Sequence, residues 1–246
     1  MDLHSTLVFR MNDDFVKIKT SILRFYTDRP ITEDANKLKG YVANQFREYS
    51  IFHNHYGNRC LFTDSKVHYM IINGVGYILG IKEGAEAIKM LSNFKELHLG
   101  NSIYTVRPIF CDKEEIIAKT DKFIQYDLIH YWLPFDDENY EKSKTLIDQR
   151  DKKLFINNIL RGNIMSLCKG LGLNVDKRDH TVYVHSKLKK SISWYKVART
   201  SYMGEFMTNM ILPDMFGLGE KVSAGFGVIK RRLECDHFLT KIKDYK

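Results

Sequence analysis

Two histidines separated by a single residue give the chain its clearest side chains for proton transfer. His53 and His55 flank Asn54 within a polar stretch of the 246-residue sequence. An imidazole changes charge near neutral pH, so a histidine in a polar turn can accept or donate a proton during a reaction. The His-x-His spacing also suits metal chelation, but no nearby set of Cys, Asp or Glu completes a metal site. The residues alone leave three interpretations open: surface histidines, proton transfer and, as the weakest, metal binding.

A glycine-rich segment near the end of the sequence has the composition of a phosphate-binding loop. The units Gly217-Leu218-Gly219 and Gly225-Phe226-Gly227 enclose five residues, among them Lys221 and Ser223. Glycine lets backbone amides approach a ligand closely, and successive amides that point into one concavity bind anions. The spacing fits neither a Walker A loop nor the dinucleotide fingerprint. We therefore expect contact with a phosphate group, with a plain glycine-rich turn as the alternative.

Positive charge collects in the second half of the chain. The formal net charge is +8 and the isoelectric point is about 9.1, which favours a polyanionic partner. Trp194 and Tyr195 lie among the basic residues, and aromatic rings can stack on unpaired bases. A solvated basic face is the alternative interpretation. The residues that we expect to contact nucleic acid here are Lys187, Lys189, Lys190, Lys196 and Arg199.

Cysteine usage and hydropathy indicate a reducing compartment. The four cysteines lie roughly 50 to 70 residues apart and form no CxxC pair, which argues against a zinc site and for reduced thiols. The first residues lack the pattern of a signal peptide, and no apolar run reaches the roughly 18 residues of a membrane span. We expect a soluble, cytoplasmic protein that does not associate with a membrane.

The first half shows the element order β-α-β-β-α-β, which is the ferredoxin-like pattern. A helix starting after a Thr32 cap carries apolar residues at helical spacing, and Asn73-Gly74 marks a tight hairpin. The expected elements are a strand over Lys17–Tyr26, a helix over about 33–47, strands over Lys66–Ile72 and Gly76–Ile81, a helix through Ile88, Leu91 and Phe94, and a strand over Ser102–Phe110.

The second half repeats this theme after a charged segment, Asp112–Asp121, that we interpret as a linker. We predict the α+β class with two tandem ferredoxin-like (RRM-like) domains, at residues 1–115 and 121–246. The expected elements are a strand over Phe123–Leu133, a helix over Asp151–Lys169, a hairpin of Thr181–Ser186 with Ile192–Val197, a segment Ser201–Leu212 that suits either helix or strand, and a last strand after the glycines.

Taken together, these features resemble the CRISPR-associated endoribonucleases that cut repeat RNA into guide RNAs, the sixth Cas family of the RAMP superfamily. The most specific match is the pair of Gly-apolar-Gly units near the C-terminus. The segment Phe52–His55, preceded by Leu38–Phe46, is similar to the N-terminal region of one branch of that family. With the tandem architecture, the resemblance covers nearly the whole chain.

The resemblance implies metal-independent cleavage of CRISPR repeat RNA (pre-crRNA), with no cofactor and with 2′,3′-cyclic phosphate and 5′-hydroxyl ends. His55 would be the main acid or base, His53 its helper or substitute, and Lys39 an electrostatic partner. Further expected partners are subunits of a CRISPR effector complex and a second copy of the chain. Two alternatives stay open: a non-catalytic RNA-binding subunit of such a complex, and a small-molecule phosphate enzyme. The tyrosines that compete for a catalytic role are Tyr26, Tyr41 and Tyr56.

Overall fold

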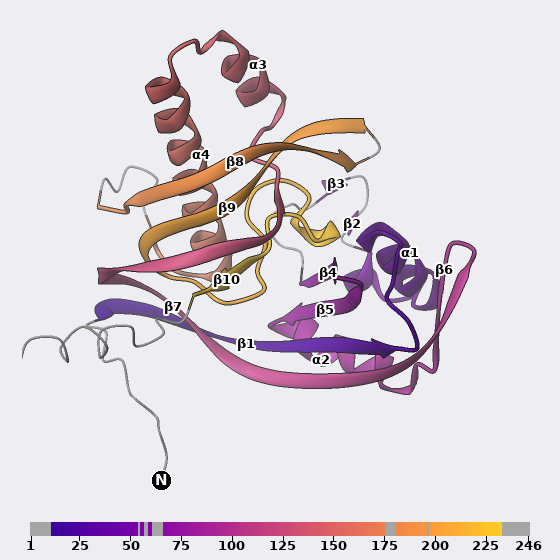
Figure 1. The fold of residues 1–246 in the computed structure, drawn as a ribbon. Coiled ribbons are helices and arrows are strands. Elements are labelled where there is room, and N and C mark those ends of the chain that lie inside the picture. Colours follow the sequence, from indigo (N-terminus) through magenta and orange to yellow (C-terminus); the bar gives the residue numbers. More distant parts are fainter. Residues whose placement is uncertain are drawn as a thin grey trace, which may run out of the picture.

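The computed structural model describes residues 11–53, 55–56, 59–60, 66–175, 181–195 and 197–232 (Figure 1). Most of its strands join one continuous antiparallel sheet. The strands are β1 Met11–Thr27, β2 His55–Tyr56, β3 Arg59–Cys60, β4 Val67–Ile72, β5 Val75–Ile81, β6 Glu96–Leu99, β7 Ser102–Trp132, β8 Val184–Tyr195, β9 Val197–Ile211 and β10 Ile229–Arg231. The helices are α1 Ala35–Gln45, α2 Glu83–Ala87, α3 Asp137–Thr145 and α4 Gln149–Leu171, with 3₁₀ turns η1 Ser50–Phe52, η2 Ile88–Asn93 and η3 Val222–Ala224.

In the first half, four strands lie in the order β4-β5-β1-β7, and the helices cover one face of this sheet. The predicted element order is confirmed, with two differences: Ile88 and Leu91 lie in the 3₁₀ turn η2 after α2, and the short strand β6 was not predicted. Asn73 and Gly74 both have positive φ, as the tight β4–β5 turn requires. Leu38 and Val42 of α1 are fully buried with Phe25 of β1, so the apolar stripe of the helix fixes its position on the sheet.

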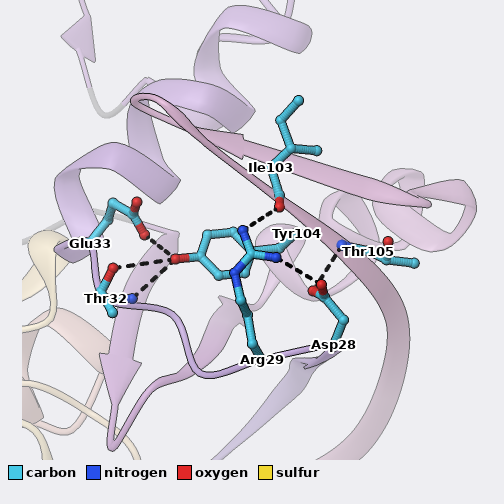
Figure 2. Close-up of polar contacts among 7 residues, drawn as sticks. All are labelled: Asp28, Arg29, Thr32, Glu33, Ile103, Tyr104 and Thr105. Atoms are coloured by element: carbon cyan, nitrogen blue, oxygen red, sulfur yellow. Dashed lines mark hydrogen bonds and ion pairs between the residues drawn. The ribbon is translucent and has the colours of Figure 1, made fainter.

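The start of α1 differs from the prediction. Asp34, and not Thr32, caps the helix, because its carboxylate accepts hydrogen bonds from the first amides of α1. Thr32 instead contacts the hydroxyl of Tyr104, which also donates to a carboxylate oxygen of Glu33 at 2.6 Å (Figure 2). Arg29 lies over the Tyr104 ring and donates to the carbonyl of Ile103. This network ties the turn before α1 to the β6–β7 hairpin.

The predicted linker is wrong, because residues 112–121 lie inside the 31-residue strand β7. This stretch pairs with β1, so that Asp112 lies opposite Ser21 and Glu114 opposite Lys19. The charges that masked the strand pattern are matched by partners far away in sequence, and the Lys17 ammonium lies 2.8 Å from the Glu114 carboxylate. One strand therefore serves both halves of the molecule.

The second half has the same strand arrangement as the first. Its order β10-β7-β9-β8 matches β7-β1-β5-β4, and α4, which follows the short helix α3, packs on one face of this sheet. Helix α4 confirms the prediction for Asp151–Lys169 and extends it by two residues at each end. Between the third and fourth strands, however, the second half has the glycine segment with the short turn η3 where the first half has α2 and η2.

The predicted second-half hairpin is wrong in its pairing. Residues 184–195 form the single strand β8, which pairs along its whole length with β9. The segment Ser201–Leu212, left open between helix and strand, belongs mostly to β9. The lysines in the middle of β8 lie on an edge strand, where charged side chains are common because they prevent pairing with other chains. Among the described helices, none is long and apolar enough to span a membrane.

Candidate functional site

Residues 217–227, the glycine loop, form a closed turn whose glycines are required by packing. The Leu218 amide donates to the Gly227 carbonyl at 3.0 Å, and Gly217 bridges to Val228. A Cβ at Gly227 would lie 2.0 Å from the Leu218 carbonyl oxygen, and one at Gly219 would strike the buried ring of Trp132. Both glycines also have positive φ. The sequence pattern therefore reflects a compact loop.

The tip of the glycine loop is its accessible part. Gly217, Gly225 and Gly227 are buried, whereas residues 219–223 are partly exposed. Lys221 has a left-handed backbone and begins the turn η3, so its amide and those that follow lie at the tip. Of the residues predicted to contact RNA in this loop, Gly219, Lys221 and Ser223 are therefore accessible, whereas Gly217, Gly225 and Gly227 are buried. The buried glycines serve the packing of the loop.

The glycine loop crosses to the first half and packs on α1 and β4. The Lys39 ammonium of α1 donates to the Ser223 hydroxyl at 3.3 Å, although the two residues are 184 positions apart. Gly225 lies so close to β4 that a Cβ there would be 2.8 Å from the Tyr69 carbonyl oxygen. We call this contact region the seam. Two residues predicted for different roles, Lys39 and Ser223, meet there.

The seam connects to the histidine turn, residues 52–55, through a buried tyrosine. The Tyr69 hydroxyl donates to the Phe52 carbonyl at 3.1 Å, and both side chains are fully buried. Burial raises the pKa of Tyr69, so the phenol stays protonated and keeps this hydrogen bond. The contacts from Gly225 to Tyr69 and from Tyr69 to Phe52 hold the turn and the glycine loop at a fixed separation.

The two histidines of the turn have different surroundings. The His53 ring lies half-buried with its Nε2 atom 3.2 Å from the Phe46 carbonyl oxygen, to which a protonated Nε2 donates. This contact fastens the turn to the end of α1. His55 is in β2, opposite Cys60 of β3, and its side chain lies outside the described residues. His53 thus has a structural partner at the end of α1.

Two of the three competing tyrosines point away from the seam. Tyr26 alternates with the buried Phe25 along β1, so it lies on the opposite sheet face from α1, where the guanidinium of Arg24 is 4.3 Å from its ring centre. The Tyr41 hydroxyl donates to the Glu96 carbonyl of β6. The side chain of Tyr56 lies outside the described residues.

The basic residues in and near β8 differ from one another in exposure and in ion pairing, which the sequence does not indicate. The Lys187 ammonium lies 3.4 Å from the Glu205 carboxylate of β9, and Arg232 binds the same carboxylate and Asp127. Lys189 and Lys190 are exposed, whereas the Arg199 side chain is half-buried. Lys196 lies outside the described residues. The strand pairing thus neutralises part of the predicted cluster, because Glu205 of β9 lies beside Lys187.

A titratable residue that the sequence analysis missed also lies beside the glycine loop. His130 of β7 contacts Phe226 edge-on, with ring centres 5.4 Å apart, and burial lowers its pKa. Its Nδ1 atom is buried without a hydrogen-bond partner. The sequence signal was a histidine in an apolar strand, which is more often a packing residue. Among the described side chains, no group of three or more His, Cys, Asp or Glu residues is arranged to hold a metal ion.

Comparison with known families identifies two matching domain models. The Cas6b N-terminal domain matches residues 16–116 and the Cas6b C-terminal domain matches residues 118–232. The chain is also 32% identical over 152 residues to the uncharacterized protein MJ0978 of Methanocaldococcus jannaschii, a match that covers 58% of this chain and 97% of that protein.

Solved structures agree with these matches. A crystal structure of Cas6b is 26% identical, with a TM-score of 0.81 over 88% of this chain and 100% of the other. A crystal structure of the CRISPR RNA processing endoribonuclease Cas6b has a TM-score of 0.66 at 23% identity, over 87% of this chain and 100% of the other. A Cas6 product complex has a TM-score of 0.57 at 12% identity, over 89% and 100%. The α+β class with two tandem ferredoxin-like domains is confirmed.

Proposed function

Because the chain belongs to the Cas6b family, we propose that it is an endoribonuclease that cleaves CRISPR repeat RNA. The observation that carries this proposal is the contact between Lys39 and Ser223 at the seam. It brings the helix that precedes the histidine turn next to the tip of the glycine loop. A phosphate bound at the tip would then lie within reach of groups from both halves.

The proposed reaction is an internal phosphoryl transfer that needs no metal ion. The 2′-oxygen before the scissile bond attacks the phosphorus, the bond from phosphorus to the 5′-oxygen breaks, and a 2′,3′-cyclic phosphate forms. A base takes the proton of the 2′-hydroxyl, and an acid returns one to the leaving 5′-oxygen. Cations that face the phosphate stabilise the charge that develops on its oxygens.

We assign the proton-transfer step to His55 and the electrostatic role to Lys39. His53 supports the turn through the Phe46 carbonyl and can substitute weakly in proton transfer. The loop tip, with Lys221 and Ser223, would hold the phosphate backbone. In this proposal the glycine loop binds the RNA and the histidine turn on the other side of the seam carries out the reaction, and the contact between Lys39 and Ser223 supports it by bringing the two regions together.

Cleavage of repeat RNA in EDTA tests the proposal directly. The expected result is cleavage at one position, and none when the nucleotide before that position is 2′-deoxy. Product from the deoxy substrate at the same position would contradict 2′-oxygen attack. Tight binding of the repeat without any product would instead identify a non-catalytic RNA-binding subunit.

Separate histidine substitutions test the assigned roles. We expect His55→Ala to lower the single-turnover rate by about 10²- to 10⁴-fold, the usual contribution of a general acid or base. His53→Ala should lower the rate less and reduce the free energy of unfolding by about 1 kcal/mol, through loss of its hydrogen bond. His98→Ala is the matched control, since His98 is an exposed histidine of the same half. Equal rates for His55→Ala and His98→Ala would refute the assignment.

A further inference from the structure

A groove in the second half lies between the helices α3 and α4 and the edge strand β8. It has a volume of about 610 Å³, within the range of roughly 300 to 1,000 Å³ that small-ligand sites occupy. Helix α3 and the start of α4 lie above β8 in Figure 1, and residues of all three elements line the groove. We call it the basic groove. It belongs neither to the seam nor to the glycine loop.

Four lysines line the basic groove, and no carboxylate does among the described residues that form its walls. Lys152 and Lys153 come from the first turns of α4, and Lys187 and Lys190 come from β8. Only Lys187 has a described acid near its ammonium group, the Glu205 carboxylate on β9. The groove therefore carries a net positive charge that an anionic ligand would neutralise.

Aromatic rings form one part of the same groove. Phe155 and Tyr202 both line it and are half-buried, so each keeps an accessible edge or face. Phe135 holds them in place: its ring stacks on Phe155 with centres 6.2 Å apart and meets Tyr202 edge-on at the same distance. Lysines with fixed aromatic rings between them are the combination that binds phosphates and unpaired bases together.

The basic groove is linked to the glycine loop through two rings. Tyr202 packs against Trp132, with ring centres 6.0 Å apart, and Trp132 is the residue against which Gly219 packs. The Trp132 indole also donates to Asn163 of α4 at 3.0 Å. These interior contacts fix the position of the basic groove relative to the glycine loop.

We infer that the basic groove binds unpaired nucleotides of RNA, in a segment outside the bond that the seam is proposed to cleave. The inference rests on the proposed function only for the choice of RNA as the ligand. An acidic protein segment would also satisfy the lysines, but it would make no use of the aromatic rings. The groove thus fixes the path of single-stranded RNA over the second half.

Binding of a labelled oligouridylate tests this inference without any cleavage step. The probe has about ten nucleotides, within the roughly 4 to 16 that single-strand-binding folds cover. We expect Lys152→Ala with Lys190→Ala to weaken its binding by about tenfold or more at low salt, and to reduce the salt dependence of the dissociation constant. The control, Lys95→Ala with Lys169→Ala, removes the same charge from exposed positions elsewhere and should change binding less than twofold.

A second variant separates stacking from charge. Tyr202→Leu keeps an apolar side chain against Trp132. It should weaken the binding of the oligouridylate by about 5- to 150-fold, which is the range expected for the loss of one stacked base. The same probe annealed to its complement should compete poorly. If both groove variants bind the probe like the wild type, the inference is wrong. It is also wrong if polyglutamate competes as well as RNA and Tyr202→Leu has no effect, since an acidic protein partner would then occupy the groove.

The two proposals fail in different ways. Groove-dependent binding of the oligouridylate without cleavage of repeat RNA would support the groove and contradict the proposed nuclease activity. If the protein cleaves repeat RNA but the groove variants bind the oligouridylate like the wild type, the proposed nuclease activity is supported and the proposed role of the basic groove is wrong.

Discussion

The two halves share a strand order but differ in the connection between their third and fourth strands. In the first half this connection is α2 with η2, which packs on β1 and β5 of its own sheet. In the second half it is the glycine loop, which leaves its own sheet and contacts α1 and β4 of the other half. One connection closes its own domain, whereas the other joins two domains and presents the candidate phosphate-binding tip.

The difference shows how a repeated fold gains a site. A connection that covers its own sheet has to pack against one surface only. The short helix α2 does so closely, because Gly80 of β5 has no side chain and lets Gly84 of α2 approach the strand. The glycine loop must match Trp132 on one side and Tyr69 on the other. That demand explains why the loop needs several glycines with positive φ, whereas α2 and η2 contain no glycine with positive φ.

The largest expected effect comes from breaking the glycine loop itself. Gly227→Ala adds a Cβ 2.0 Å from a carbonyl oxygen at a position with positive φ, so we expect a loss of about 3 kcal/mol or more in the free energy of unfolding. Gly100→Ala is the matched control, because Gly100 also has positive φ but an added Cβ there meets nothing within 4 Å. It should cost about 1 kcal/mol. Urea unfolding measures both, and equal losses would show that the loop is not tightly packed.

A smaller loss of stability is expected from a change at Tyr69, which links the glycine loop to the histidine turn. Tyr69→Phe removes the hydrogen bond to the Phe52 carbonyl and should cost about 1 to 3 kcal/mol, since that buried carbonyl loses its partner. We also expect a slower cleavage step, measured by single-turnover kinetics with repeat RNA.

The comparison variant for Tyr69 is Tyr126→Phe, which removes a buried hydroxyl inside the second half. It should reduce stability by a similar amount and affect the cleavage rate less. A larger rate loss for Tyr126→Phe would mean that the Tyr69 contact does not position the turn.

The smallest effect is a pH dependence from His130. Burial lowers the pKa of this imidazole in the folded protein below its ordinary value of 6.5, so the unfolded chain binds the proton more tightly. The stabilisation is complete above pH 6.5 and is lost as the pH falls towards the folded pKa, by up to about 1.4 kcal/mol per unit of difference. Urea unfolding at pH 7.5 and 5.5 should show a smaller pH effect in His130→Phe. An identical pH effect in both proteins would contradict this assignment.

The sequence predicted correctly those elements that depend on a few neighbouring residues. The turn at Asn73-Gly74, the apolar stripe of α4 and the paired Gly-apolar-Gly units each act over a few residues, and the structure contains each of them. The prediction of a linker at Asp112–Asp121 was wrong because the charges of this segment pair with Lys17 of β1 and with Lys89, which are far away in sequence. Long-range pairing of this kind leaves no local signal.

The sequence could suggest which residues belong to the candidate site, but it could not predict how those residues are arranged in space. His53 and Ser223 were selected by residue type and Lys39 by the family resemblance, but the contact between Lys39 and Ser223 depends on the path of the whole sheet. The burial of Gly217, Gly225 and Gly227 also follows from tertiary packing. The aromatic part of the basic groove was missed because its rings come from three separate elements.

The shared strand β7 has a consequence for any attempt to divide the protein. A cut near residue 117, between the two matched domain models, would fall within the stretch of β7 that pairs with β1 and, at Ala118, with β9. Each fragment would end in half of a strand and expose an unpaired sheet edge, which favours aggregation. The strand also prevents the halves from rotating freely about a hinge. A ligand that contacts both halves would therefore meet a largely preformed surface.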